Sequence, residues 1–270
     1  MRLLIDSGNS RLKWAKLPGT YCRAQAFAEQ GVLDWSRRGA LRAFTRLLRT
    51  LEPPTSLYVC NVAGAAVQRS LATAVADAGL AKPCFVRTGQ RFGDLRNGYR
   101  EAWRLGADRW VALIGAMHEY PGHNLCVIGL GTALTADLVE ANGTHHGGCI
   151  VPGPQLMISA LLDRTAGIRA RAAGVRGAAA AMPASPFARD TRHALLAGSG
   201  HACAALIERA VRAARAQLRS RVELIVGGGA ADAVGVLLST RFRRNDELVL
   251  RGLAVIAQSA TASASRPAMP

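Results

Sequence analysis

The feature that most constrains the fold is a strand–turn–strand pattern that occurs once in each half of the chain. Residues 3–13 (LLIDSGNSRLK) and residues 124–140 (NLCVIGLGTALTADLVE) both show an apolar strand, a turn of small residues and a second strand. A strand, a Gly/Asn turn and another strand are typical of a hairpin. Because Gly8 aligns with Gly131, the repeat predicts two similar domains, with a phosphate held between the two turns.

The first hairpin carries residues that suit a nucleotide. Asp6 follows the apolar run, and the turn continues through Ser7, Gly8, Asn9 and Ser10. Small turn residues let backbone N–H groups approach an anion, and an adjacent carboxylate can hold a metal ion. The stretch therefore predicts a site for a nucleoside triphosphate with its magnesium. An ordinary turn is the alternative, because Asp, Gly and Asn are common turn residues.

Length and periodicity predict two domains of α/β type. The chain has 270 residues, of which 50% are hydrophobic, which is enough for two cores of ordinary size. Strands alternate with amphipathic helices after the opening hairpin. Pro121-Gly122 marks the expected boundary. We expect an N-terminal domain over 1–120, a C-terminal domain over 121–260 and a disordered tail over 261–270.

The strong positive charge raises the question of a nucleic-acid partner. The formal net charge is +16, and nearly all of the basic residues are arginines spread along predicted helices. A basic surface can attract nucleic acid or anionic substrates. However, no basic run alternates with aromatic residues as a single-strand binder requires. Nucleic-acid binding is therefore not expected, and a coding bias towards arginine accounts for the charge.

Other residue types argue against a membrane protein and a metal protein. No apolar run reaches the length of a membrane span, and the sequence enters a strand without a signal peptide, so a cytoplasmic location is expected. The six cysteines form no C-x-x-C pair, which predicts buried free thiols. His145 and His146 fall in a predicted turn with no third ligand nearby, which predicts solvated loop residues.

Two further stretches each allow a structural and a functional interpretation. Asp108 lies at or just before the N-terminus of a predicted helix, over 111–119, where it could be an N-cap or a general base. The glycines Gly227, Gly228 and Gly229 join a predicted strand to a helix. Such a junction admits a phosphate or nucleoside close to the backbone, or is only a tight turn.

Five short motifs occur in a recognisable order. They are D-S-G-N-S-x-x-K at 6–13, Y-x5-L-G-A-D-R at 99–109, G-T-A-x-T-x-D at 131–137, G-G-C-I-V-P-G at 147–153 and G-G-G at 227–229. Together they make the chain resemble the type III pantothenate kinases over residues 1–258.

The resemblance implies both fold and activity. The implied fold is two ribonuclease H-like domains of the acetate and sugar kinase/actin/heat-shock ATPase superfamily, with ATP in the cleft between them. The implied reaction is ATP-dependent phosphorylation of pantothenate to 4'-phosphopantothenate, the first step of coenzyme A biosynthesis. Mg-ATP would be the phosphate donor, and the enzyme would be a homodimer.

The resemblance also implies roles for individual residues. Asp108 would accept the proton of the substrate hydroxyl, which shifts the interpretation of this residue from cap towards base. Asp6 and the turn through Lys13, together with Thr132, would hold Mg-ATP and its phosphates. The residues implied for the pantothenate pocket are Tyr99, Gly106, Ala107, Asp108, Arg109 and Thr191.

The sequence departs from the family pattern at three places. Gly129 stands where the family usually has an Asp that helps to bind an activating monovalent cation, K⁺ or NH₄⁺. Glycine offers only a backbone oxygen, so the sequence leaves the requirement for a monovalent cation open. Ala102 replaces a usual proline, and residues 165–168 keep only part of a T-A-x-L-P segment.

Two other functions remain as alternatives. One is a regulatory or nucleic-acid-binding protein built on the same fold, which the basic composition favours. The other is another small-molecule kinase of the superfamily, because fold does not determine substrate.

Overall fold

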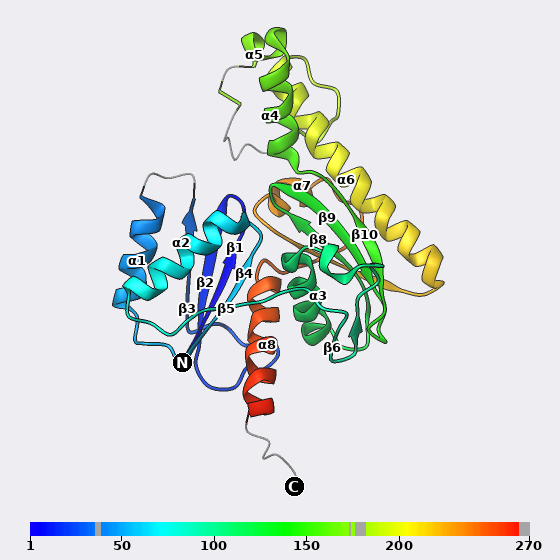
Figure 1. Cartoon of the computed structure of the whole chain (residues 1–270). Helices are drawn as coiled ribbons and strands as arrows, with labels where there is room; N and C mark the ends of the chain where they lie inside the picture. Colours follow the sequence, from blue (N-terminus) through cyan, green and yellow to red (C-terminus); the bar gives the residue numbers. More distant parts are fainter. Residues whose placement is uncertain (36–38, 173, 176–181, 265–270) are drawn as a thin grey trace. The chain divides into compact units, whose positions relative to one another are not determined.

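The chain divides into two compact units, each with its own set of internal contacts. The computed structural model describes residues 1–35, 39–172, 174–175 and 182–264. The first unit is Met1–Pro121 together with Glu247–Pro270, and the second is Gly122–Asp246. Each unit is built on a five-stranded mixed sheet (Figure 1).

The last helix corrects two expectations from the sequence. Helix α8 (Leu248–Ala264) belongs to the first unit, although the sequence analysis placed it in the C-terminal domain. It also continues through residues 261–264, which were expected to form part of a disordered tail. Residues 265–270 lie outside the described part of the chain. The physical reason is packing, since α8 lies against α3 (Ala107–Glu119) and the strands of the first sheet.

The sheet of the first unit has the order β3-β2-β1-β4-β5. Its strands are β1 (Arg2–Ser7), β2 (Arg11–Leu17), β3 (Glu29–Asp34), β4 (Ser56–Asn61) and β5 (Cys84–Phe85). Strands β1, β2 and β3 pair antiparallel, and β4 and β5 add in parallel.

Alternation along these strands gives the sheet two different faces. On one face, α1 (Ala40–Thr50) and α2 (Gly64–Asp77) complete a hydrophobic core. The core includes Leu3, Ile5, Leu12, Trp14, Phe44, Leu48, Leu57, Val59 and Leu71. Side chains of the intervening positions point to the opposite face. Helices α3 and α8 contact the sheet there (Figure 1).

The segment 88–105 leads into α3 and carries Tyr99 of the Y-x5-L-G-A-D-R motif. It contains the short hairpin of β6 (Arg91–Phe92) and β7 (Leu95–Arg96), followed by a single 3₁₀ turn, η1 (Ala102–Arg104). Asn97 organises the segment, because its Nδ2 donates to the carbonyl oxygens of Gly89 at 3.1 Å and of Ala102 at 3.2 Å. One asparagine thus ties both ends of the segment just before α3.

The second unit repeats the strand order of the first. Its strands are β8 (Asn124–Leu130), β9 (Ala133–Val139), β10 (His145–Pro152), β11 (Val222–Gly227) and β12 (Arg243–Arg244), in the order β10-β9-β8-β11-β12. The first three are antiparallel and the last two are parallel, as in the first unit. The predicted repeat of the hairpin is therefore confirmed as a repeat of the whole sheet.

The helices of the second unit are α4 (Pro154–Arg164), α5 (Ala166–Arg171), α6 (Thr191–Leu218) and α7 (Ala231–Gly235). Helix α6 runs without a break through Gly198 and Gly200. The alanine-rich stretch 172–186 lies partly outside the described residues. Its described residues Val175 and Met182 are buried in a core cluster with α4 and α6.

No described helix combines the length and the apolar character that crossing a membrane requires.

Candidate functional site

The sheet of the first unit places a charged group at the carboxyl end of β1. Asp6 lies opposite Lys13 in the antiparallel register and beside Cys60 of β4 in the parallel register. All three residues occupy positions that alternate with the core residues, so they share the face on which α3 and α8 lie. The sequence predicted Asp6 and Lys13, and the fold adds Cys60.

Asp108 completes this group from the start of α3. It lies close enough to Asp6 to raise the pKa of the Asp6 carboxyl group. Burial makes the largest contribution, Lys13 opposes it, and the resulting pKa is about 7 instead of 3.8. Burial also raises the pKa of the Cys60 thiol, with further contributions from Asp6 and Asp108. These effects place the two carboxylates, one ammonium group and one thiol within electrostatic reach of each other.

The structure rules out the N-cap interpretation of Asp108. The N-cap of α3 is Gly106, and Asp108 is the second residue of the helix, so the N-cap interpretation is wrong. Asp108 Oδ1 accepts a hydrogen bond from the backbone N–H of Arg109 at 2.8 Å. A carboxylate in the first turn also interacts favourably with the helix dipole. Ala107 is the first residue of the same turn.

The buried Arg109 pairs with Tyr99. The Arg109 Nη1 donates a hydrogen bond to the Tyr99 hydroxyl at 2.8 Å, and its Cζ lies 5.5 Å from the centre of the Tyr99 ring. Arg109 is only 6% exposed, which makes it a shielded cation held in place by an aromatic ring. The residues predicted for the substrate pocket between Tyr99 and Arg109 are therefore together, directly beside Asp108.

The residues in the turn of the first hairpin differ in their burial. The Gly8 N–H closes the turn by donating to the Arg11 carbonyl oxygen at 3.0 Å. Ser7 is fully buried, and its Oγ has no hydrogen-bond partner among the described residues. Since Ser7 faces away from Asp6 along the strand, its hydroxyl does not join the charged group. Asn9 and Ser10 are exposed at the tip of the turn.

Three glycine motifs of the second unit converge on the turn between β8 and β9. The Gly153 N–H donates to the Thr132 carbonyl oxygen at 2.9 Å. A Cβ atom on Gly153 would lie 2.3 Å from the Gly131 carbonyl oxygen, which no side chain tolerates. Gly228 has φ +113°, and a Cβ there would lie 2.3 Å from the Leu130 carbonyl oxygen. Close backbone packing thus explains why glycine occupies these positions.

The junction after β11 is a tight turn stabilised by the ion pair between Arg244 and Asp246. A Cβ on Gly227 would lie 2.1 Å from the Asn245 carbonyl oxygen, and the Gly228 N–H donates to Asp246 Oδ1 at 2.7 Å. Arg244 binds the same carboxylate with Nε at 2.8 Å and Nη2 at 2.7 Å. The tight-turn interpretation is therefore correct for the backbone. Gly229 is exposed beside it.

Thr191 belongs to a different unit from the other predicted substrate residues. It is the first residue of α6 in the second unit, where Asp190 caps the helix by accepting from the His193 N–H at 3.0 Å. Tyr99 and Arg109 belong to the first unit.

The residues around Gly129 do not suit a carboxylate-bound monovalent cation. In the repeated sheet Gly129 is equivalent to Asp6, but its register neighbours are Thr135 and Gly227 instead of Lys13 and Cys60. A Cβ on Gly129 would lie 2.8 Å from Thr135 Oγ1, so the threonine hydroxyl fills the space of the missing side chain. The available donors are a hydroxyl group and backbone oxygens.

Sequence reasoning misjudged one buried pair. His145 was expected in a solvated turn but lies on β10 and is 1% exposed, with Nε2 2.9 Å from Asp137 Oδ1. Asp137 is 4% exposed. The irregular register between His145 and Gly148 conceals the strand, because two consecutive glycines resemble a turn. His146 is partly exposed and contacts Glu140, as a surface residue does.

The cysteines are free, as expected, but only half of them are buried. Cys60, Cys126 and Cys203 are buried, whereas Cys22, Cys84 and Cys149 are exposed.

Comparison with solved structures supports the fold. The chain superposes with a TM-score of 0.58 and 18% identity on a Campylobacter jejuni protein described as a conserved Baf family transcriptional activator, covering 96% of this chain and 99% of that one. A Sinorhizobium meliloti protein described as a 2-dehydro-3-deoxygalactonokinase gives a TM-score of 0.55 at 15% identity, with the same coverage. The fold is that of the acetate and sugar kinase/actin/heat-shock ATPase superfamily, as the motifs predicted.

Comparison of sequences identifies the family. The family model described as type III pantothenate kinase matches residues 2–213. The type III pantothenate kinase of Burkholderia thailandensis is 40% identical over 274 residues, covering 96% of this chain and 98% of the relative. The protein of the same name from Cupriavidus taiwanensis is 37% identical over 278 residues, with the same coverage. The chain therefore belongs to the type III pantothenate kinase family.

Proposed function

We propose that this protein transfers the γ-phosphoryl group of Mg-ATP to the hydroxyl group of pantothenate, giving 4'-phosphopantothenate for coenzyme A biosynthesis. The observation that carries this proposal is the proximity of Asp6, Lys13 and Asp108 on one face of the first sheet. Phosphoryl transfer depends mainly on positioning and charge neutralisation, with a carboxylate to orient the attacking hydroxyl. The charged group provides a cation to neutralise phosphate charge and a carboxylate to orient the hydroxyl. Membership of the family indicates that pantothenate is the substrate.

In this mechanism Asp108 acts as the general base. Its carboxylate accepts the proton of the pantothenate hydroxyl as the oxygen attacks the phosphorus atom, and the bond to the leaving ADP oxygen breaks. Lys13 neutralises phosphate charge from the adjacent strand. Arg109 and Tyr99, fixed against each other, orient the acceptor beside Asp108.

Asp6 suits the role of a magnesium contact. Mg²⁺ binds oxygen ligands, and it commonly uses one or two carboxylates together with substrate phosphates and water. When bound, the ion neutralises the charge that develops on the phosphoryl oxygens. A divalent cation beside Asp6 favours the ionised carboxylate, which offsets the raised pKa of this group.

We propose further that Thr132 and the exposed turn residues Asn9 and Ser10 contribute to phosphate binding, and that Gly229 lies on the adenosine side. All four residues are exposed, and Asn9, Ser10 and Thr132 carry polar side chains, which supports these roles. Thr191 is proposed as a further pantothenate contact on its motif alone. We also propose that the protein is a homodimer, which the resemblance implies. We place it in the cytoplasm, where ATP is available.

The test is a coupled kinase assay with pantothenate and Mg-ATP on the wild type and Asp108→Asn. The variant is expected to lose about 10²- to 10⁴-fold in kcat, because it lacks a proton acceptor. Its ATP binding, measured as the rise in Tm with added Mg-ATP, is expected to persist. Asp94→Asn, an exposed substitution in the turn between β6 and β7, serves as the control. Full activity of Asp108→Asn would rule out the base assignment.

We also propose that turnover does not depend on a monovalent cation held at Gly129. The position offers no side-chain carboxylate, and Thr135 occupies the adjacent space. The assay is expected to give the same kcat when potassium and ammonium are replaced by a bulky organic cation at equal ionic strength. Strong activation by potassium would contradict this proposal without affecting the role of Asp108.

A further inference from the structure

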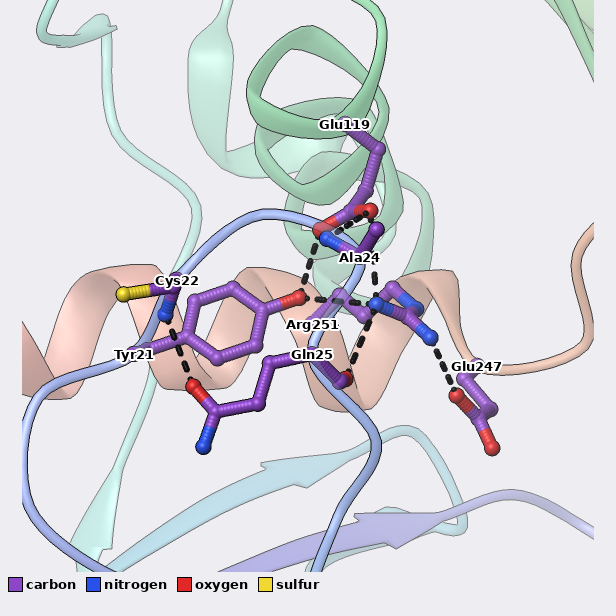
Figure 2. A network of polar contacts seen from close by, with 7 residues as sticks. All are labelled: Tyr21, Cys22, Ala24, Gln25, Glu119, Glu247 and Arg251. Carbon is purple, nitrogen blue, oxygen red and sulfur yellow. Dashed lines mark hydrogen bonds and ion pairs between the residues drawn. The ribbon is translucent and has the colours of Figure 1, made fainter.

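The C-terminal end of α3, far from Asp108, carries a shielded carboxylate with several partners. Glu119 Oε1 accepts a hydrogen bond from the Tyr21 hydroxyl at 2.5 Å, and Oε2 accepts from the Ala24 N–H at 3.0 Å (Figure 2). Arg251 Nη1 lies 3.3 Å from the same carboxylate. The Glu119 side chain is 6% exposed, so these contacts are largely shielded from water. The end of α3 is therefore bound to the loop between β2 and β3 and to α8.

Arg251 connects α8 to the same loop. Its Nη1 donates to the Tyr21 hydroxyl at 3.0 Å and to the Gln25 carbonyl oxygen at 3.4 Å (Figure 2). Its Nη2 contacts Glu247 at 2.7 Å, one turn earlier on the chain. Burial and the hydrogen bond to Glu119 raise the pKa of the Tyr21 hydroxyl, although Arg251 opposes this shift, so Tyr21 remains a donor at neutral pH. We call Tyr21, Glu119 and Arg251 the anchor.

Ala24 shows that the anchor imposes a conformation on the loop. Its φ is +59°, a left-handed backbone conformation that is uncommon for residues other than glycine. The bond from the Ala24 N–H to Glu119 holds this conformation. A strained residue persists only where its surroundings determine it strongly.

Close backbone contacts hold α3 against α8 at one crossing. A Cβ on Gly115 would lie 2.2 Å from the Leu248 carbonyl oxygen, and a Cβ on Gly252 would lie 1.9 Å from the Val111 carbonyl oxygen. The two backbones therefore pack directly against each other at this crossing, with no room for a side chain at either glycine. The anchor restricts the movement of the C-terminal end of α3, which this crossing does not hold.

The position of α3 determines the position of Asp108. Asp108 and Glu119 lie on the same uninterrupted helix, about 16 Å apart along its axis at 1.5 Å per residue. A shift at one end is transmitted to the other because a short helix behaves as a rigid rod. We propose that Glu119 and Arg251 are positioning residues that hold Asp108 in its productive place relative to Asp6. This inference rests on the proposed role of Asp108.

The test compares Glu119→Gln with a matched control elsewhere in the fold. Glu208 of α6 accepts hydrogen bonds from the backbone N–H groups of Ser239 and Thr240, each at 2.8 Å, and from their hydroxyl groups. Glu208→Gln therefore loosens a comparable network in the second unit. Both variants are expected to lower Tm. Glu119→Gln is expected to lose about ten- to hundredfold in kcat, with an unchanged KM for ATP, because small misplacements of a catalytic group are costly. Glu208→Gln is expected to keep kcat.

Tyr21→Phe provides a second variant if Glu119→Gln does not fold. It removes one hydroxyl group and retains the ring that packs beside Phe27 at 6.2 Å. A smaller loss of kcat, again with unchanged KM for ATP, is expected. Unchanged kcat in both anchor variants, or an equal loss in Glu208→Gln at the same Tm, would overturn the positioning role. Full activity of Asp108→Asn would instead show that the proposed base assignment failed.

Discussion

At the scale of single residues, the two halves of the repeat have diverged in charge. In the first unit, Asp6, Lys13 and Cys60 occupy adjacent positions across three strands. In the second unit, the equivalent places hold Gly129 and its neighbours, which bear no charge. One backbone arrangement thus supports a charged group in one unit and close backbone packing in the other. The difference lies in the side chains, since the strand order is the same.

The raised pKa of Asp6 predicts how stability depends on pH. Because folding raises this pKa from 3.8 to about 7, the native state binds more protons than the unfolded state between these values. The contribution of Asp6 to the free energy of unfolding is therefore full below pH 4 and is lost as the pH rises through 7. Without nucleotide or Mg²⁺, the difference between the Tm of Asp6→Asn and the Tm of the wild type is expected to increase as the pH rises from 4 to 7.

The control for this measurement is Asp77→Asn, which changes an exposed carboxyl group on α2. Its Tm is expected to follow the wild type across the same pH range. A constant difference between Asp6→Asn and the wild type would mean that burial does not shift the Asp6 titration.

The sequence predicted three residues of the charged group but not its electrostatics. Asp6 follows from the strand pattern, since turn residues after an apolar run mark the end of a strand. Lys13 and the role of Asp108 as a base came only from the resemblance to the family. Cys60 could not be found in this way, because its place beside Asp6 depends on the pairing of two strands far apart in the chain. The buried state of Ser7 likewise depends on which face the helices cover.

At the scale of elements, glycine contacts explain several motifs. In the second unit, Gly153 and Gly228 each bring backbone within contact distance of the turn between β8 and β9. The sequence indicated that these glycines have a special role. It could not show whether a ligand or another strand approaches them, because both require the absence of a side chain.

Gly153→Ala and Gly198→Ala are expected to act in opposite directions. Alanine at 153 would clash with the Gly131 carbonyl oxygen, so a loss of about 1–3 kcal/mol in the free energy of unfolding is expected. The displaced turn is also expected to raise the KM for ATP through Thr132. A Cβ on Gly198 meets no atom within 4 Å, so alanine there is expected to stabilise α6 by about 0.5–1 kcal/mol.

Denaturant unfolding monitored by circular dichroism measures both effects. If Gly153→Ala were as stable as the wild type, the backbone contact would be more adaptable than its distances indicate.

At the scale of the whole molecule, the net charge of +16 is the property that the kinase mechanism does not use. Several cations, such as Arg109, Arg244 and Arg251, have structural partners that explain their positions. Arginines on exposed helix faces raise the attraction of any polyanion. This leaves a regulatory function on nucleic acid as a distinct hypothesis, separate from catalysis.

Gel-shift titration with duplex DNA tests that hypothesis. Non-specific attraction is expected to produce binding only at low salt, with a steep loss of affinity as salt increases, because bound cations are released from the phosphates. We expect no sequence preference and no effect of Asp108→Asn on the shift. Tight binding that survives physiological salt and prefers one sequence would favour a regulatory protein.

The position of α8, which follows the second unit in the sequence but belongs to the first, has a consequence for folding during translation. The ribosome releases residues 1–121 first, but the helix that covers one face of β1, β2 and β4 emerges last. At about 5–20 residues per second, synthesis of the intervening second unit takes roughly 6–25 s. During this interval the nascent first unit carries an uncovered apolar layer. The second unit, which is continuous in the chain, can therefore finish folding before the unit that was begun earlier.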